Sequence, residues 1–316
     1  MKSHSSRICR FIVSAFITLA APWPSPGRAE EPGTGKTTAE SSQAGLFSRV
    51  HLIGASLTAG FFEGEMLGGK KTPQYSLVNY IEAALQAAHD PVKRDASVFF
   101  FTNPEKSLTT QIEAVQKAKP TLVVSLDGVF WFCYGHVGRE EDRIARFEKG
   151  LELLARIDAP LVLGDIPDAR HASGGILNAR EVPTPETLSS CNQRLKKWCD
   201  GRPNVRLLPL AAMMKACVAN EPLEMAGLTW EKGKTRSLLQ RDRLHPARHG
   251  IAALAIAALD AACAFSPDKS GPVCRNLDTV YREGISRGEK AAASAAPKPG
   301  SPPPPAPPTT PAQPAP

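Results

Sequence analysis

Five short apolar runs alternate with stretches of helical spacing through the middle of this chain. The runs are rich in β-branched or aromatic residues, which is typical of buried strands, and they lie at 50–54, 96–101, 121–126, 160–164 and 204–210. Apolar side chains recur at helical intervals in the stretches 77–89, 108–118, 140–157, 186–198 and 250–265. Alternating strands and helices predict a parallel sheet with helices on both faces. We expect this α/β domain to occupy residues 46–285, a length that suits one domain.

Residues 1–29 have the features of a secretory signal peptide. Three basic residues precede an apolar run at 11–21, and the small residues Gly27 and Ala29 lie just before an expected cleavage point ahead of Glu30. The apolar run is too short to span a bilayer, so the alternative to cleavage is a helix that lies at the membrane interface. Cleavage predicts a mature protein in a periplasm or outside the cell, without a transmembrane span.

The composition of the two flanks predicts that they lie outside the folded domain. Residues 30–45 form a linker rich in Gly, Thr and Ser, and residues 286–316 form a Pro/Ala-rich tail. The last 26 residues hold 11 of the 29 prolines. We expect the tail to be disordered and extended, because proline donates no backbone hydrogen bond. It is a spacer or the ligand of an unknown partner.

The net charge excludes one class of partner. The leader holds four of the 38 basic residues and no acidic residue, so its removal lowers the net charge from +7 to +3. A surplus of this size does not indicate nucleic-acid binding.

The cysteines agree with export. Six remain without the leader, and an even number in an oxidising compartment permits up to three disulfides, whose pairing the count does not determine. We expect Cys263 and Cys274 to pair, because a short loop containing proline and glycine joins them. Structural zinc prefers close C-x-x-C pairs, and neither these cysteines nor the histidines have such spacing, so no metal site is predicted. The six are Cys133, Cys191, Cys199, Cys217, Cys263 and Cys274.

Two short segments carry candidate catalytic residues. Ser56 follows the first predicted strand, at the edge of the sheet where parallel strands present ligands and catalytic groups. Asp242 and His245 lie three residues apart, so a carboxylate can orient an imidazole while the other ring nitrogen takes a serine proton. The alternatives are a helix cap at Ser56 and a capping aspartate beside a surface histidine. The combination of all three favours catalysis.

These two segments resemble the SGNH, or GDSL, hydrolase family. The sequence Gly-Ala-Ser-Leu-Thr-Ala-Gly at 54–60 is similar to the family's nucleophile motif, and Asp-Arg-Leu-His-Pro at 242–246, followed by Gly250, is similar to its closing motif. The resemblance implies a three-layer α/β/α sandwich with a flavodoxin-like sheet of five parallel strands, and an esterase that needs no cofactor. It assigns Ser56 as nucleophile, His245 as base and then acid, and Asp242 as the orienting carboxylate.

The resemblance departs from the family at the oxyanion hole. Ser107 stands at the expected glycine, Val129 at the expected asparagine, and Ala55 replaces the aspartate beside the nucleophile. The expected oxyanion donors are therefore the backbone N–H groups of Ser56 and Ser107. Loss of one donor costs about 3 kcal/mol of transition-state stabilisation, so the missing asparagine predicts slow chemistry or another donor.

The segment after the third predicted strand supplies a candidate substrate pocket. Phe130 and Trp131 can bury an acyl chain or stack on a sugar ring. Asp127 either caps the turn or holds a substrate hydroxyl. The sequence thus predicts an exported serine esterase acting on an acyl or acetyl ester of an envelope glycan, a lipid or a small molecule. An acyltransferase that uses the same Ser56, and a binding module that retains the fold without turnover, remain alternatives.

Overall fold

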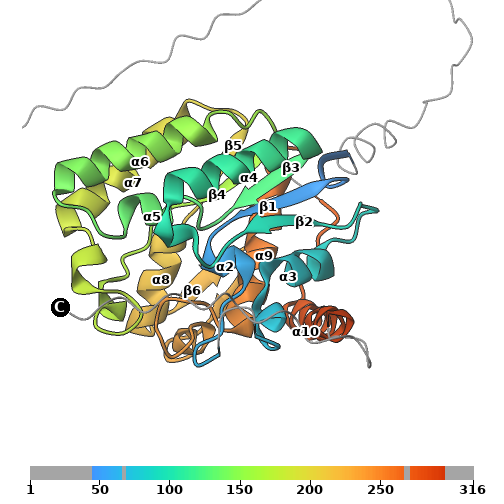
Figure 1. Ribbon diagram of the computed structural model, residues 1–316. Helices are drawn as coiled ribbons and strands as arrows, with labels where there is room; N and C mark the ends of the chain where they lie inside the picture. Colours follow the sequence, from blue (N-terminus) through green and yellow to red (C-terminus); the bar gives the residue numbers. More distant parts are fainter. Residues whose placement is uncertain (1–44, 66–68, 267–270, 296–316) are drawn as a thin grey trace, which may run out of the picture. The chain divides into compact units, whose positions relative to one another are not determined.

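The computed structural model of the chain describes residues 45–65, 69–266 and 271–295 (Figure 1). The predicted signal peptide, nearly all of the linker and the last part of the tail lie outside these residues. Within the described part, no helix is both long and apolar enough to cross a bilayer.

A parallel sheet of five strands forms the centre of the fold, in the order β2-β1-β3-β4-β5. Every neighbouring pair is parallel, and this order is the flavodoxin-like one. The prediction of a five-stranded α/β fold is confirmed. Chain order reverses between β1 and β3, and open α/β sheets bind ligands outside the strand ends at such a point. The strands are β1 (Val50–Gly54), β2 (Lys93–Ala96), β3 (Leu122–Ser125), β4 (Leu161–Gly164) and β5 (Val205–Leu208).

Helices cover both faces of this sheet (Figure 1). Side chains alternate between the faces, so Leu52 and Val124 pack in one half of the core while Ile53 and Val123 pack in the other. The first half is covered by α3 (Leu77–Ala84) and α9 (Arg248–Cys263), with α10 (Leu277–Ser294) packed on both. The second half is covered by α4 (Pro104–Ala118), α6 (Glu140–Leu154) and α7 (Pro185–Asp200).

The second strand lies earlier in the sequence than predicted. It spans Lys93–Ala96 rather than 96–101, and its first three side chains are exposed. β2 is an edge strand, where polar side chains meet water and limit pairing with other chains, so it has no apolar pattern. The apolar run beyond it turns instead into a 3₁₀ helix at Phe100–Thr102, which buries Phe100.

The folded domain extends beyond the predicted boundary at residue 285, because α10 continues to Ser294. The buried residues of this helix are Val280 and two glycines, Gly284 and Gly288. A Cβ at Gly284 would lie 2.4 Å from the Tyr80 ring, and one at Gly288 would lie 2.8 Å from the Gln74 backbone. Two of its three buried residues are therefore glycines, so few apolar side chains mark this helix in the sequence.

Two further elements were also absent from the prediction. They are the helix α8 (Leu210–Ala219) and the antiparallel hairpin of β6 (Leu223–Met225) and β7 (Leu228–Trp230). Both lie between β5 and α9 in the sequence.

The expected disulfide between Cys263 and Cys274 is not formed, and both residues are free thiols. The two sulfur atoms have different surroundings. Cys263 Sγ lies against Gly271, where a Cβ would meet it at 2.5 Å. Cys274 Sγ instead contacts the backbone oxygen of Asn276 at 4.0 Å.

Candidate active site

Ser56 is the first residue of a short helix, α2 (Ser56–Ala59), that begins immediately after β1. The end of β1 is held by Gln111 of α4, whose amide group accepts from Gly54 N and donates to Gly54 O, both at 2.9 Å. Gly54 is required here, because a Cβ would lie 2.1 Å from the Asp127 carboxylate. The turn into α2 therefore presents Ser56 at the carboxyl end of the sheet, as the motif predicts.

Ser56, His245 and Asp242 form one hydrogen-bonded chain. His245 Nε2 lies 2.9 Å from Ser56 Oγ, and His245 Nδ1 lies 2.6 Å from Asp242 Oδ2. Asp242 also accepts the backbone N–H groups of Leu244 at 2.9 Å and His245 at 3.0 Å. An ionised carboxylate only accepts, so Nδ1 carries a proton and Nε2 is free to accept the serine proton.

The Asp242 carboxyl is held in its ionised form. Burial by itself favours the neutral acid, but the hydrogen bond and charge of His245, with the amides of Leu244 and His245, lower the pKa of Asp242 below its usual value. The side chains of His245 and Asp242 are only 6% and 3% exposed, so solvent competes little for this pair.

Two residues that the sequence analysis did not single out hold the histidine in place. The Phe61 ring stacks on His245, with ring centroids 4.0 Å apart. Gln240 donates its backbone N–H to His245 O at 2.8 Å, and its side-chain amide donates to the carbonyls of Phe61 at 2.6 Å and Pro246 at 3.0 Å. Gln240 thus ties the His245 segment to the chain that follows α2.

Asp127 binds the start of α2. Its Oδ1 accepts from Ala55 N at 3.0 Å and Thr58 Oγ1 at 2.6 Å, and its Oδ2 accepts from Leu57 N at 2.8 Å. Burial raises the pKa of Asp127, whereas these hydrogen bonds act in the opposite direction. Of the two roles considered for Asp127, the structure shows a cap, but the cap serves α2 rather than the turn after β3. Asp127 thus supplies, from the segment that follows β3, a carboxylate beside Ser56 where residue 55 is alanine.

The two predicted oxyanion donors differ in whether their N–H group already has a hydrogen-bond partner. Ser56 N–H lies at the first position of α2, where a helix offers no backbone acceptor, and no hydrogen bond of the described residues uses it. Ser107 is wrong as a donor, because its N–H binds Asn103 O at 3.0 Å in the first turn of α4. The Val129 side chain packs in the hydrophobic core and is 1% exposed. Ser56 N–H is therefore the one predicted donor that is available.

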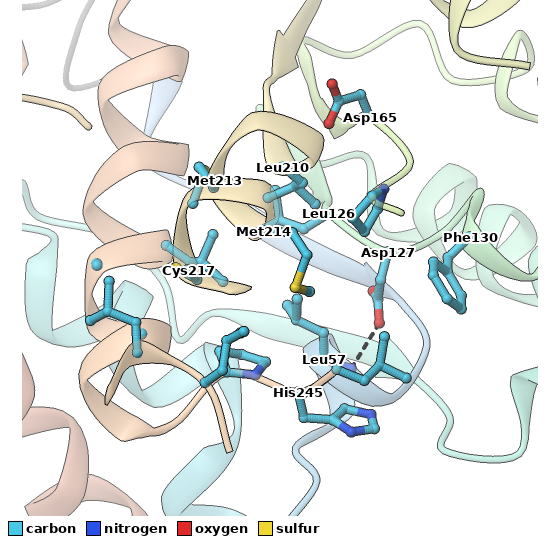
Figure 2. Close-up of a pocket in the computed structure, with 18 of the residues that line it drawn as sticks. Leu57, Leu126, Asp127, Phe130, Asp165, Leu210, Met213, Met214, Cys217 and His245 are labelled. Carbon is cyan, nitrogen blue, oxygen red and sulfur yellow. Dashed lines mark hydrogen bonds between the residues drawn. The ribbon is translucent and has the colours of Figure 1, made fainter. Parts of the chain in front are cut away.

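A pocket opens beside Ser56 and His245 (Figure 2). The three predicted pocket residues, Asp127, Phe130 and Trp131, all line it. Phe130 and Trp131 belong to α5 (Phe130–Cys133), a single turn that follows β3. Most of the remaining wall comes from α8, the β6–β7 hairpin and α9, which sequence patterns did not place near the site.

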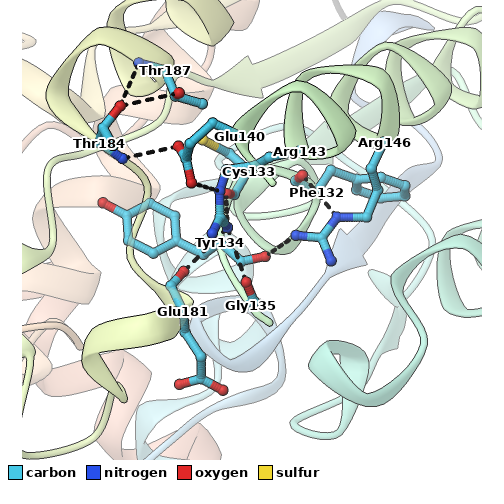
Figure 3. Close-up of polar contacts among 10 residues, drawn as sticks. All are labelled: Phe132, Cys133, Tyr134, Gly135, Glu140, Arg143, Arg146, Glu181, Thr184 and Thr187. Atoms are coloured by element: carbon cyan, nitrogen blue, oxygen red, sulfur yellow. Dashed lines mark hydrogen bonds and ion pairs between the residues drawn. The ribbon is translucent and has the colours of Figure 1, made fainter. Parts of the chain in front are cut away.

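Two arginines of α6 hold α5 in position (Figure 3). Arg143, 1% exposed, donates to the carbonyl oxygens of Cys133 at 2.7 Å and Gly135 at 2.9 Å. Arg146 donates to those of Phe132 at 3.1 Å and Tyr134 at 2.5 Å. A helix end leaves such carbonyls without partners, and cations there are favourable. The arginines therefore fix the turn that carries the aromatic wall of the pocket.

The chain is similar to several solved structures. No protein-family model and no curated protein matches it. A lipase/acylhydrolase from Enterococcus faecalis is 17% identical, with 68% of this chain and 96% of that chain covered and a TM-score of 0.42. A mutant acetyl-xylooligosaccharide esterase from a Geobacillus species is 19% identical, with 68% and 94% covered and a TM-score of 0.43. These likenesses are weak, so the fold class follows from the sheet order itself.

Proposed function

We propose that this protein is an exported serine hydrolase that cleaves an acyl ester at Ser56. The observation that carries the proposal is the hydrogen-bonded chain from Ser56 Oγ through His245 to Asp242, at 2.9 and 2.6 Å. A chain of this kind activates a serine and appears on unrelated folds. The pocket beside Ser56 provides space for the group attached to the reacting carbon.

The residues act in the following order in this proposal. Ser56 Oγ attacks the ester carbonyl while His245 Nε2 takes its proton, and Asp242 stabilises the resulting imidazolium. The tetrahedral intermediate collapses, His245 returns the proton to the leaving alcohol, and the acyl group stays on Ser56. Water, activated by His245, then releases the acid and restores the serine.

Stabilisation of the oxyanion is the weak part of the site. Ser56 N–H is the available donor, and the Val129 side chain offers none. One missing donor costs about 3 kcal/mol, so we expect turnover slower than a complete oxyanion hole would give. This departure also favours the second candidate function, a binding module that retains the fold.

Labelling with a fluorophosphonate tests the nucleophile, base and oxyanion donor together, because the reagent bonds to serine only when all three function. We expect one label per chain at Ser56, found by peptide mapping of protein recovered from the exported fraction. His245→Ala should lower the labelling rate sharply, whereas His89→Ala, at a half-buried histidine whose ring contacts the Asp90 carbonyl, should not. A folded protein that is never labelled and cleaves no aryl ester would support the binding module instead.

Ester cleavage is expected to fall in acid, because only a neutral imidazole accepts the Ser56 proton. Because the pKa of Asp242 is lowered, its carboxylate stays ionised at a lower pH than an ordinary carboxyl group does. Its contribution to the free energy of unfolding is likewise present above the ordinary carboxyl range and is lost as the pH falls through the lowered pKa.

Asp242→Asn should lower kcat by about 10⁴-fold, because an amide neither holds the required tautomer nor stabilises the imidazolium. Asp260→Asn is the matched control, since Asp260 pairs with Arg275 near the surface of α9. Steady-state rates over a pH series measure both effects. An unchanged kcat in Asp242→Asn would remove this carboxylate from the mechanism.

Export is proposed from the leader. A basic start, a short apolar run and the small residues before Glu30 are the features that a signal peptidase uses.

A further inference from the structure

We infer that the site takes esters of an extended, apolar acyl chain, and that this chain lies in the pocket walled by α8, the β6–β7 hairpin and α9. The inference rests on the proposed function, because it names the acyl group that Ser56 would receive. The inference favours lipid-like esters over acetyl esters. The sequence did not distinguish these two kinds of substrate.

One face of α8 forms much of the wall. Leu210, Met213, Met214 and Cys217 follow the i, i+3, i+4, i+7 spacing of a single helix face, and all four line the pocket. Figure 2 shows Met213, Met214 and Cys217 around the same cavity as Leu57 and His245. Methionine side chains are flexible and polarisable and adapt to varied apolar ligands. One face of α8 thus lines the pocket that also holds the reacting serine.

The hairpin and α9 complete an apolar enclosure. Leu223 and Met225 of β6 and Ala253 and Leu254 of α9 line the same pocket. The hairpin side is fixed by Thr235, whose hydroxyl bonds the carbonyl oxygens of Ala216 at 3.2 Å and Glu221 at 2.8 Å. The wall is therefore a built part of the fold, tied to the end of α8.

The carboxylates in the wall are already engaged by the protein. Asp127 holds the start of α2, and Asp165 accepts the backbone N–H of Ala211 at 2.6 Å, at the start of α8. A sugar-binding pocket needs free polar groups that fix hydroxyls. Apart from Ser56 and His245, the wall offers chiefly Leu, Met, Ala and aromatic side chains.

The extent of the apolar wall favours a chain over an acetyl group. The wall takes in residues of α8, β6 and α9, most of which an acetyl group on Ser56 would leave without contact. Each methylene transferred from water into such a pocket is worth about a fourfold gain in kcat/KM, until the chain reaches the end of the cavity.

The test is the kcat/KM of the full mature protein for aryl esters that differ only in acyl length, from acetyl to dodecanoyl. We expect at least a tenfold rise from acetyl to octanoyl. Ala253→Phe and Met214→Trp should each move the maximum toward shorter chains by narrowing the cavity. Ala212→Phe is the matched control, because Ala212 is exposed on α8 and does not line this pocket. Its length profile should equal that of the wild type.

A second measurement does not depend on turnover. Decanoate should displace a fluorescent fatty acid from Ser56→Ala protein, and Ala253→Phe in that background should weaken the displacement at least tenfold. Thermal melting shows whether each variant is folded, and Met214→Trp replaces Ala253→Phe if the latter is not.

The outcomes separate the two proposals. Cleavage that is fastest for acetyl esters, or indifferent to length, overturns the acyl-chain inference and leaves the hydrolase standing. Decanoate binding without cleavage of any ester supports the pocket and overturns the hydrolase. Absence of both overturns both.

Discussion

Replacing Ser56 with alanine is expected to lower kcat/KM for ester cleavage by about 10⁴-fold or more. Ser56 Oγ is the hydroxyl that His245 Nε2 reaches, at 2.9 Å, so its removal leaves the base without a nucleophile to activate. Residues that act as one unit are not additive. The double variant Ser56→Ala/His245→Ala should therefore be little worse than either single variant. Steady-state rates on an octanoyl aryl ester measure all three.

Ser97→Ala is the matched control for this experiment. Ser97 follows β2 at the same edge of the sheet, and its hydroxyl accepts the Phe99 N–H at 3.1 Å without touching the histidine. Its rate should stay within about twofold of the wild type, as expected for a surface substitution. A Ser56→Ala rate within tenfold of the wild type would show that another group is the nucleophile.

Asp127→Ala is expected to damage both the fold and the chemistry. The carboxylate accepts the N–H groups of Ala55 and Leu57 and the Thr58 hydroxyl, and each buried donor left without a partner costs about 1–3 kcal/mol. The free energy of unfolding should therefore fall by about 3 kcal/mol or more. Because a displacement of about 1 Å lowers catalysis about 100-fold, fluorophosphonate labelling of the folded fraction should fall by a similar factor.

Asn276→Ala distinguishes this positioning role from general destabilisation. Asn276 caps α10 by accepting the Thr279 N–H at 2.9 Å, so its loss should cost about 1 kcal/mol without slowing Ser56 labelling. Asp127→Asn should lie between the two, since its amide keeps one accepting oxygen. A folded Asp127→Ala protein labelled at the wild-type rate would contradict the positioning role.

The position of the Asp127 carboxylate also explains how residue 55 can be alanine rather than aspartate. Residue 55 is 1% exposed and packs in the core, while the carboxylate beside the nucleophile comes from the segment that follows β3. Gly54 leaves the space that this carboxylate occupies, because a Cβ there would meet it at 2.1 Å.

Local sequence patterns were sufficient to predict most of the fold. β1, β3 and β4 lie inside the predicted runs because they are buried on both faces and so are mostly apolar. β5 also lies inside its predicted run, although it is an edge strand in which Arg206 and Leu207 are only partly buried. The second strand escaped detection because Lys93, Arg94 and Asp95 are exposed at the edge of the sheet. Helix α10 was not predicted because two of its buried residues, Gly284 and Gly288, are glycines and contribute no apolar side chain to the pattern.

The sequence by itself determined the alternation that builds the sheet and the three residues Ser56, Asp242 and His245, because their motifs are local and strand ends meet at one edge. Tertiary structure alone decided what surrounds them. The direction of Asp127, the engaged amide of Ser107 and the apolar wall from α8 depend on contacts between segments far apart in the chain. Periodicity reports which face of an element is buried, but not which neighbour buries it.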